Sequence, residues 1–457
     1  MQDGKSKLSV RPSVYIPTLY FAEGLPYTMV NLMSVVFYKN LGASNSFIGW
    51  ATSFLYLPWT LKFLWSPLVD VRSTKKRWIV VAQMVLAALS LLTAAACFLD
   101  NALYVTVAVF LFLGIASATH DVAIDGYYMD VLDREQQAFF VGIRNAAYKV
   151  AWLLGSGGLV FLAGSLAEST SLGVKGGWFV AFLCCSLIFL ACSLLHMKVL
   201  PEPGSAGLDQ SDTEAGESPG KDLDLNPGKF LSIFLSYLDQ PRIAAVIIYI
   251  LIFRAGDAFM LKMAQPFLLD SPDKGGLGIA TSEVGIIYGT VGMLFLLAGG
   301  IFGGWLVSRF GLRKCLLPTA VVQNFAILLY YWLAMLKPGV EGVLFGVNLS
   351  QTLASVGVSG RWLDASLIFT TLVNSFEQFS YGLGTAAYTV FLLTTVRRDY
   401  KAAHYAIATA LMALGLMIPG AVSGNIADAV GYEKFFLFSF LVSIPGIITI
   451  FFLPLEK

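Results

Sequence analysis

Charged residues are scarce in this sequence: Asp, Glu, Lys and Arg together make up only 13% of its 457 residues. Soluble domains carry about 25% charged residues, whereas 57% of the residues here are hydrophobic. Together with a mean hydropathy of +0.72, this composition indicates a protein embedded in a lipid bilayer. The formal net charge is +1, so the charge balance predicts no nucleic-acid partner.

Cysteine and histidine are also rare, with five and three residues. None of the cysteines has metal-ligand spacing, and their positions do not suggest a disulfide framework. The sequence has no Walker A loop, HExxH, GxSxG or Cys/His cluster. We therefore expect no cofactor, no metal, no catalytic residues and no enzymatic activity. Without a nucleotide site, any work that the protein performs would draw on an ion gradient or a solute gradient.

Long apolar stretches make up most of the sequence. About twenty apolar residues cross a bilayer as a helix. Residues 1–12 are polar and lack the apolar core of a cleavable signal. Twelve candidate spans follow, near 14–38, 46–69, 78–98, 102–128, 138–164, 176–197, 243–268, 284–307, 315–336, 366–396, 403–426 and 435–454. This pattern predicts an all-α integral membrane fold with twelve transmembrane helices.

A polar segment separates the first six spans from the last six. Residues 201–229 are rich in Pro, Gly, Ser and acidic residues, a composition that does not bury enough apolar surface to fold. We predict a six-helix bundle over 1–200, a flexible cytoplasmic linker over 201–229 and a second six-helix bundle over 230–457. "FLSIFLSYL", directly after the linker, is compatible with a short amphipathic surface helix.

The two halves repeat a short motif. "NLGASNSFIGW" precedes span 2 and "GLGIATSEVGI" precedes span 8, and their Gly, Ser and Gly residues align at an offset of 236. A basic loop follows each of these spans, "DVRSTKKR" in the first half and "SRFGLRK" in the second. Such internal repetition is typical of transporters built from two related bundles.

The distribution of Lys and Arg predicts the orientation. With an even number of spans, both termini lie on one side, which would carry nineteen basic residues against six on the other. Basic residues accumulate in cytoplasmic loops. We therefore predict that both termini are cytoplasmic.

Ionisable residues inside spans are costly and usually face an interior or a cavity. Here they fall in six of the twelve predicted spans, as Glu23, Lys62, His120, Asp121, Asp125, Arg144, Lys149, Arg254, Asp257, Lys262 and Glu377. Spans 3, 9 and 12 have none in their interiors, and span 6 has only His196 at its end.

Four stretches carry a family resemblance. "KFLWSPLVD", "ASATHDVAIDGYYMDVL", "FRAGDAF" and "NSFEQFSYGLGTAAYTVFLL" resemble the AmpG-type muropeptide permeases of the major facilitator superfamily. The resemblance implies two six-helix bundles around a central cavity lined by spans 1, 4, 7 and 10, with spans 3, 6, 9 and 12 outside. It also implies import of GlcNAc-anhydro-MurNAc peptides across the bacterial inner membrane. His120 is a departure, because the family usually has Gln there.

The residues themselves suggest a proton-coupling or ion-pair group. Asp121 and Asp125 are four apart, so they share one helix face, and Arg144 should lie about as deep as Asp125 on the antiparallel neighbour. A structural ion pair and a titrating carboxylate both remain open. The candidates for coupling or pairing are Glu23, His120, Asp121, Asp125, Arg144, Lys149 and Glu377.

Substrate contacts are predicted at a second set of residues. Lys262 has no carboxylate one turn away and is a candidate for binding a substrate carboxylate, while Arg254 and Asp257, three apart, could pair with each other. Aromatic rings near these charges suit an amphipathic ligand such as a sugar peptide. The substrate-binding candidates are Arg254, Asp257, Lys262, Gln378, Tyr127, Tyr148 and Tyr381. Asp70, Arg72, Arg309 and Arg313 match the facilitator gating loops, although cytoplasmic loops are basic in any case.

The leading functional hypothesis is a monomeric secondary transporter that imports GlcNAc-anhydro-MurNAc or a related sugar with protons. The alternative is a major facilitator transporter for another anionic solute, acyl-CoA-like or siderophore-like, for which export is an open direction. A non-transporting sensor or a membrane enzyme is a third class. An enzyme would need clustered catalytic groups, whereas the buried charges here are spread over six spans.

Overall fold

The computed structural model describes residues 11–71, 73–201, 235–336, 343–344, 347–348, 365–397 and 401–454. Helix covers each of the twelve predicted ranges. In the described part of the chain, eight helices are long and apolar enough to cross a membrane. The exact number of crossings stays a prediction. Residues 202–229 of the predicted linker, Arg72 and most of the segment between spans 9 and 10 lie outside the described residues.

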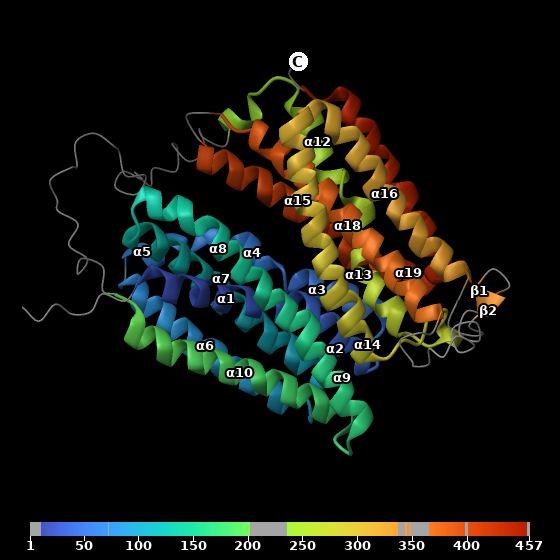
Figure 1. Ribbon diagram of the computed structural model, residues 1–457, viewed down its shortest axis with the longest axis horizontal. Helices are drawn as coiled ribbons and strands as arrows, with labels where there is room; N and C mark the ends of the chain where they lie inside the picture. The colour runs from blue at the N-terminus through green and yellow to red at the C-terminus, as the bar shows by residue number, and fades with distance from the viewer. Residues whose placement is uncertain are drawn as a thin grey trace, which may run out of the picture. The chain divides into compact units, whose positions relative to one another are not determined.

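The described helices form two compact units (Figure 1). Unit 1 contains Met1–Met33, Leu55–Gly155 and Leu166–Leu225, and the rest of the chain belongs to unit 2. Two stretches of the first sequence half, Ser34–Phe54 and Ser156–Ser165, are therefore part of unit 2. These units group residues by their contacts and do not follow the order of the sequence. The division into two six-helix halves at the linker therefore stays a prediction.

Unit 1 is built from helices throughout its described residues. They are α1 (Pro12–Thr28), the π-helical η1 (Met29–Met33), α4 (Leu57–Leu61), the 3₁₀ turn η2 (Lys62–Leu64), α5 (Ser66–Val71), α6 (Lys75–Ala96), α7 (Ala102–Val131), α8 (Arg134–Trp152), the start of the π-helical η3 (Leu153–Leu159), the end of α9 (Val160–Ser169) and α10 (Gly173–Val199).

Local sequence sets where the unit 1 helices begin. Thr74 caps α6 by accepting a hydrogen bond from the Arg77 amide. Asp133 and Gln136 form a capping box at the start of α8, in which each side chain satisfies a backbone amide of the other. Helix α8 begins at this cap, directly after α7 ends, and packs against α1.

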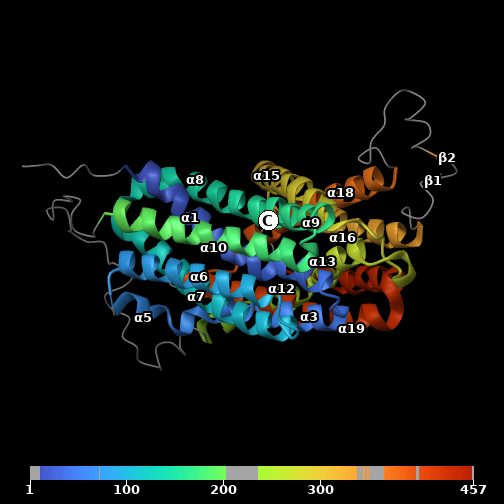
Figure 2. The ribbon, with the colours of Figure 1, turned by 90° about the horizontal axis from the view of Figure 1, so that it is seen from below.

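Two pairs of contacts hold unit 1 together. Helices α6 and α10 run side by side (Figures 1 and 2), and the hydroxyls of Ser186 and Ser193 on α10 donate to backbone carbonyls of α6. Helix α1 packs against α7 and α8, with Ile16, Leu19 and Ile124 fully buried in the shared core. Large apolar side chains remain exposed along α6 and α10, the pattern expected of helices that face lipid.

Unit 2 contains the other helices and a small hairpin. Its elements are α2 (Ser34–Asn40), α3 (Asn45–Phe54), most of η3 and α9, α12 (Ile243–Ile252), α13 (Ala255–Leu269), η5 (Pro272–Lys274), α14 (Thr281–Val284), the π-helical η6 (Gly285–Gly292), α15 (Met293–Phe310), α16 (Leu312–Leu336), β1 (Val343–Leu344), β2 (Val347–Asn348), α18 (Ala365–Thr394), α19 (Lys401–Thr449) and η9 (Ile450–Phe452).

Packing in unit 2 centres on α18 and α19. Helix α18 lies against α15 and α16, while α19 contacts α3, α12, α13 and α16. Gly311 and Gly431, at φ +82° and +78°, interrupt the helical path between α15 and α16 and within α19. Because this φ region strains residues with a Cβ, glycine permits both breaks. The hairpin β1–β2 is antiparallel, with Val343 opposite Asn348.

The repeated motif adopts the same geometry in both copies. Gly42 and Gly278 both have left-handed backbone, at φ +78° and +66°, and a helix begins three residues later in each copy. The second glycine of each motif lies against another backbone: Gly49 faces α19, and Gly285 faces η3 and α9. The sequence repeat therefore encodes a repeated turn followed by a closely packed helix.

Candidate functional site

Charged side chains of opposite sign come together in unit 1. Lys62 Nζ lies 2.6 Å from Oδ2 of Asp121. The Glu23 carboxyl group, only 9% exposed, is within hydrogen-bonding reach of Asp121. Its Oε2 atom has no hydrogen-bond partner among the described residues. With Asp125 and Arg144 nearby, three carboxyl groups share this cluster with two cations.

Tyr20 joins Asp125 to Arg144. The Tyr20 hydroxyl donates to Oδ1 of Asp125 at 2.9 Å, and Nη1 of Arg144 donates to the same hydroxyl at 3.0 Å. Nη1 also lies 3.5 Å from Oδ1 of Asp125, and the guanidinium stacks within about 5 Å of the Tyr20 and Tyr128 rings. The two groups that helical spacing predicted to meet are thus neighbours, with a phenol between them. Their role in coupling stays a prediction.

The α7 helix explains why these carboxylates converge. Asp121 and Asp125 lie one turn apart on the same face of α7, where Asp121 pairs with Lys62 of η2, and Asp125 pairs with Arg144 of α8 and accepts from Tyr20 of α1. Asp125 is nearly half exposed at its side chain, and Arg144 is about a third exposed. This end of the cluster is therefore partly exposed, whereas Glu23 is buried.

Aromatic rings gather next to the charged cluster. Tyr27 of α1 stacks face to face on Trp152, with centroids 5.4 Å apart, and meets Trp59 edge-on at 5.3 Å. Tyr148 borders both Tyr27 and Trp152. Lys149 places its ammonium 4.1 Å from the Trp152 ring and has no carboxylate within 4.0 Å among the described residues. We define Tyr27, Trp59, Tyr148 and Trp152 as the aromatic wall.

His120 lies in a buried hydrogen-bonded string that crosses four helices. Its Nε2 atom is 3.0 Å from the amide nitrogen of Gln83, the other amide atom of Gln83 is 2.9 Å from Nδ1 of His196, and Nε2 of His196 is 2.9 Å from the Thr18 hydroxyl. Both histidines are 0% exposed. The arrangement ties α1, α6, α7 and α10 together, while Nδ1 of His120 has no hydrogen-bond partner among the described residues. The proposed role of His120 in coupling or pairing stays a prediction.

Unit 2 holds a second group of buried polar side chains. Arg254 donates to the Tyr381 hydroxyl, and Gln323 donates to Asp257. Glu377 accepts from its neighbour Gln378 at 2.8 Å. Asp257 and Glu377 are 1% and 2% exposed, so these carboxylates are enclosed among the helices of their own unit.

Lys262 is the cation of unit 2 with the simplest surroundings. Its Nζ donates to the Thr52 hydroxyl at 2.9 Å, and no described carboxylate lies within 4.0 Å of it. Gly420 permits this position, because an added Cβ there would be 3.2 Å from Cε of Lys262. Lys262 therefore lacks an acidic partner both within its own span and among the described residues that surround it in the fold.

Some predicted site residues lie elsewhere. Tyr127 is 0% exposed in the core around Tyr15 and donates to the Pro201 carbonyl at 3.0 Å. Tyr127 thus occupies a packing position, and its assignment as a substrate contact stays a prediction. Arg309 and Arg313 are exposed at the turn between α15 and α16. The Asp70 side chain and Arg72 lie outside what the structure describes.

Several contributors were missed at the sequence level. Tyr20 and Tyr27 were hidden among nineteen tyrosines, and Trp152 follows Lys149 in an apolar stretch. Gln83 and Gln323 are uncharged amides, which a search for ionisable residues passes over. A search for any polar side chain within an apolar span would have found both glutamines, whereas no sequence signal separates Tyr20 from the other rings.

Comparison with known proteins agrees with this architecture. The family model of the Major Facilitator Superfamily matches residues 18–392. The anhydromuropeptide permease of Escherichia coli K12 is 25% identical over 446 residues, covering 95% of this chain and 78% of the relative. The putative transporter AmpG 4 of Rickettsia conorii is 22% identical, covering 95% and 94%.

Solved structures show the same fold. The nucleoside transporter NupG aligns with a TM-score of 0.68 at 13% identity, covering 97% of this chain and 99% of that one. The inward-open xylose transporter XylE from E. coli aligns with a TM-score of 0.63 at 12% identity, covering 97% and 96%. With a family match over most of its length and this fold, the chain belongs to the Major Facilitator Superfamily and is a multi-pass membrane transporter.

Proposed function

We propose that this transporter imports GlcNAc-anhydro-MurNAc, its peptides or a related sugar across the bacterial inner membrane, coupled to protons, with both termini in the cytoplasm. The names of the relatives support the substrate class, since an anhydromuropeptide permease and putative AmpG transporters match almost the whole chain. The excess of basic residues in one set of predicted loops supports the orientation.

The main support for proton coupling is the imbalance between carboxyl groups and cations in the charged cluster of unit 1. Glu23, Asp121 and Asp125 together supply one negative charge more than Lys62 and Arg144 neutralise. An unpaired charge away from water is costly, and the Glu23 side chain is buried. A proton held on Glu23 would therefore balance the charge of the cluster.

The aromatic wall and the nearby cations support a sugar ligand with an acidic group. Apolar faces of sugar rings pack on aromatic side chains, while Lys149, at the wall's edge, has no acidic partner among the described residues. In unit 2, Lys262 is equally free of a described carboxylate, and a muropeptide supplies carboxylates from its lactyl group or peptide. Each of these cations is available to one such group.

Uptake into proteoliposomes tests the proposal. Radiolabelled GlcNAc-anhydro-MurNAc should accumulate under an inward proton gradient, and a protonophore should abolish accumulation. Uptake that persists unchanged with the protonophore would show a facilitator and remove the coupling role. A Lys262→Gln variant should bind the neutral disaccharide GlcNAc-GlcNAc as wild type does but lose affinity for the acidic ligand.

Another anionic solute remains the alternative, because the same unpaired cations Lys149 and Lys262 would suit an acyl-CoA-like or siderophore-like compound. Competition with unlabelled acetyl-CoA separates the two. The muropeptide proposal predicts that acetyl-CoA does not reduce uptake of GlcNAc-anhydro-MurNAc, whereas strong inhibition would favour the alternative.

A further inference from the structure

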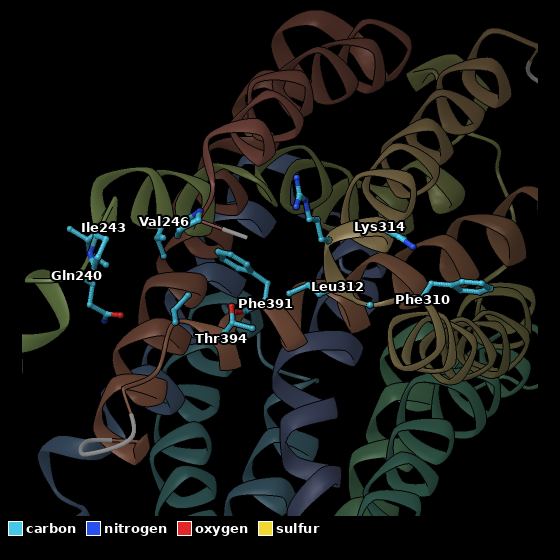
Figure 3. Close-up of a pocket in the computed structure, with 13 residues that line it drawn as sticks. Gln240, Ile243, Val246, Phe310, Leu312, Lys314, Phe391 and Thr394 are labelled. Atoms are coloured by element: carbon cyan, nitrogen blue, oxygen red, sulfur yellow. The ribbon is translucent and has the colours of Figure 1, made fainter. Parts of the chain in front are cut away.

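A cavity of about 980 Å³ lies at one end of unit 2, where α12 begins, α18 ends and the chain turns from α15 into α16. In Figure 3, Gln240, Ile243 and Val246 line one side, while Phe310 and Lys314 lie on the opposite side. This volume is at the upper end of the range found for ligand pockets. The cavity is formed entirely by residues of unit 2.

The lining of the cavity has an apolar and a basic part. Val246 and Phe391 are 4% and 1% exposed and form apolar surface inside it, with Ile243 beside them. Arg313 and Lys314 bring two positive charges to its edge, and none of the described residues that line it is acidic. Neither cation has a described carboxylate within 4.0 Å. The cavity thus combines uncompensated positive charge with apolar walls.

The surface around the cavity is suited to contact with lipid. Phe451 and Phe452, just before the lining residue Pro454, are 69% and 60% exposed. Phe310, which lines the cavity, and Leu393, beside Thr394, are also more than half exposed. Exposed large apolar side chains that gather in one place mark surfaces that contact lipid or another apolar partner. An amphiphile can therefore enter from the bilayer with its polar end at Arg313 and Lys314.

We propose that this cavity binds an anionic glycerophospholipid, with the headgroup phosphate at Arg313 and Lys314 and the start of the acyl chains against Ile243, Val246 and Phe391. Basic pockets between transmembrane helices bind anionic headgroups in this way. The apolar walls distinguish a lipid from free phosphate, which would gain nothing from them. The proposal is independent of the transported substrate.

Binding is tested on the full-length protein in detergent with two lipids of equal chain length, dioleoyl-phosphatidylglycerol and dioleoyl-phosphatidylcholine. Phosphatidylglycerol should raise the Tm more than phosphatidylcholine does, and native mass spectrometry should show it retained. The Arg313→Gln/Lys314→Gln variant should lose this preference and bind phosphatidylglycerol roughly tenfold or more weakly, since each surface cation contributes about 1 kcal/mol.

The matched control is Arg77→Gln/Lys198→Gln, which removes two exposed basic residues of unit 1 predicted to lie on the same membrane side. This control should keep the preference for phosphatidylglycerol. An equal loss in both variants would show nonspecific attraction and overturn the proposal. A Tm rise with inorganic phosphate alone, equal to that with phosphatidylglycerol, would also overturn it, because the cavity would then be a site for a free anion.

Discussion

Lys39 and Asp270 form a closely buried ion pair in unit 2. Nζ of Lys39 is 2.6 Å from Oδ2 of Asp270, and the side chains are 10% and 8% exposed. The Tyr432 hydroxyl donates to the same carboxylate oxygen at 2.6 Å, and Lys39 also donates to Asn45 at 2.7 Å. The pair therefore connects α2 and α3, from the first sequence half, to α13 and α19.

Replacing one partner of this pair should destabilise unit 2. Asp270→Asn leaves the Lys39 ammonium buried without its carboxylate, a change that costs about 3–5 kcal/mol in buried pairs. We expect a clearly lower Tm in detergent. The control is Asp273→Asn, an exposed residue three positions along the chain, which should leave the Tm unchanged. Equal stability of the two variants would argue that Lys39 finds other partners.

Asp125→Asn should abolish gradient-driven uptake while the protein remains folded. Since Asp125 and Arg144 are partly exposed and the Tyr20 hydroxyl still contacts Arg144, we expect a loss of only about 1–2 kcal/mol of stability. The double variant Asp125→Asn/Arg144→Gln should regain stability. If it also regains gradient-driven uptake, Asp125 is a structural partner of Arg144 and carries no proton.

Glu23→Gln should separate transport from coupling. Glutamine keeps the size of the buried side chain and its hydrogen bonding, but it neither binds nor releases a proton. We expect exchange of labelled for unlabelled substrate to continue across the membrane, while accumulation against a gradient is lost. Both are measured in the same proteoliposomes, and intact accumulation in this variant would remove Glu23 from the coupling group.

Trp152→Leu should weaken substrate binding more than it slows transport. The substitution removes the ring that stacks on Tyr27 and lies under Lys149, and aromatic stacking contributes about 0.5–1.5 kcal/mol. The expected result is a KM raised about two- to tenfold at a similar maximal rate. Trp305→Leu, on the half-exposed surface of α15, is the control and should leave KM unchanged.

Gly424→Ala should loosen the contact between α19 and α3. A Cβ at Gly424 would clash with the Asn45 carbonyl, so the two backbones must move apart, at a cost of about 1–3 kcal/mol. Gly304→Ala on α15 is the matched control, because nothing lies within 4 Å of its added Cβ. The Tm of the first variant should fall and that of the second should stay or rise slightly, as expected for alanine in a helix.

Hydropathy was sufficient to predict the helical membrane fold, because a chain in lipid must satisfy its backbone groups within each span. Charged side chains are also costly in lipid, so their positions within the spans indicated which residues face the interior of the protein. Helical spacing placed Asp125 near Arg144, and the aligned glycines of the repeated motif form equivalent turns at Gly42 and Gly278. These are local or nearest-neighbour relationships, which short-range geometry determines.

Only the tertiary structure decided which distant side chains meet. Tyr20 lies between Asp125 and Arg144, and Lys62 rather than Arg144 pairs with Asp121. Likewise, Tyr127 packs in the core while Tyr27 joins the aromatic wall. The hydropathy of a span is the same whether a tyrosine packs in the core or joins the aromatic wall, and whether a cation pairs with one carboxylate or another. The choice depends on the rotation and contacts of helices far apart in sequence, which the order of residues along a single span does not specify.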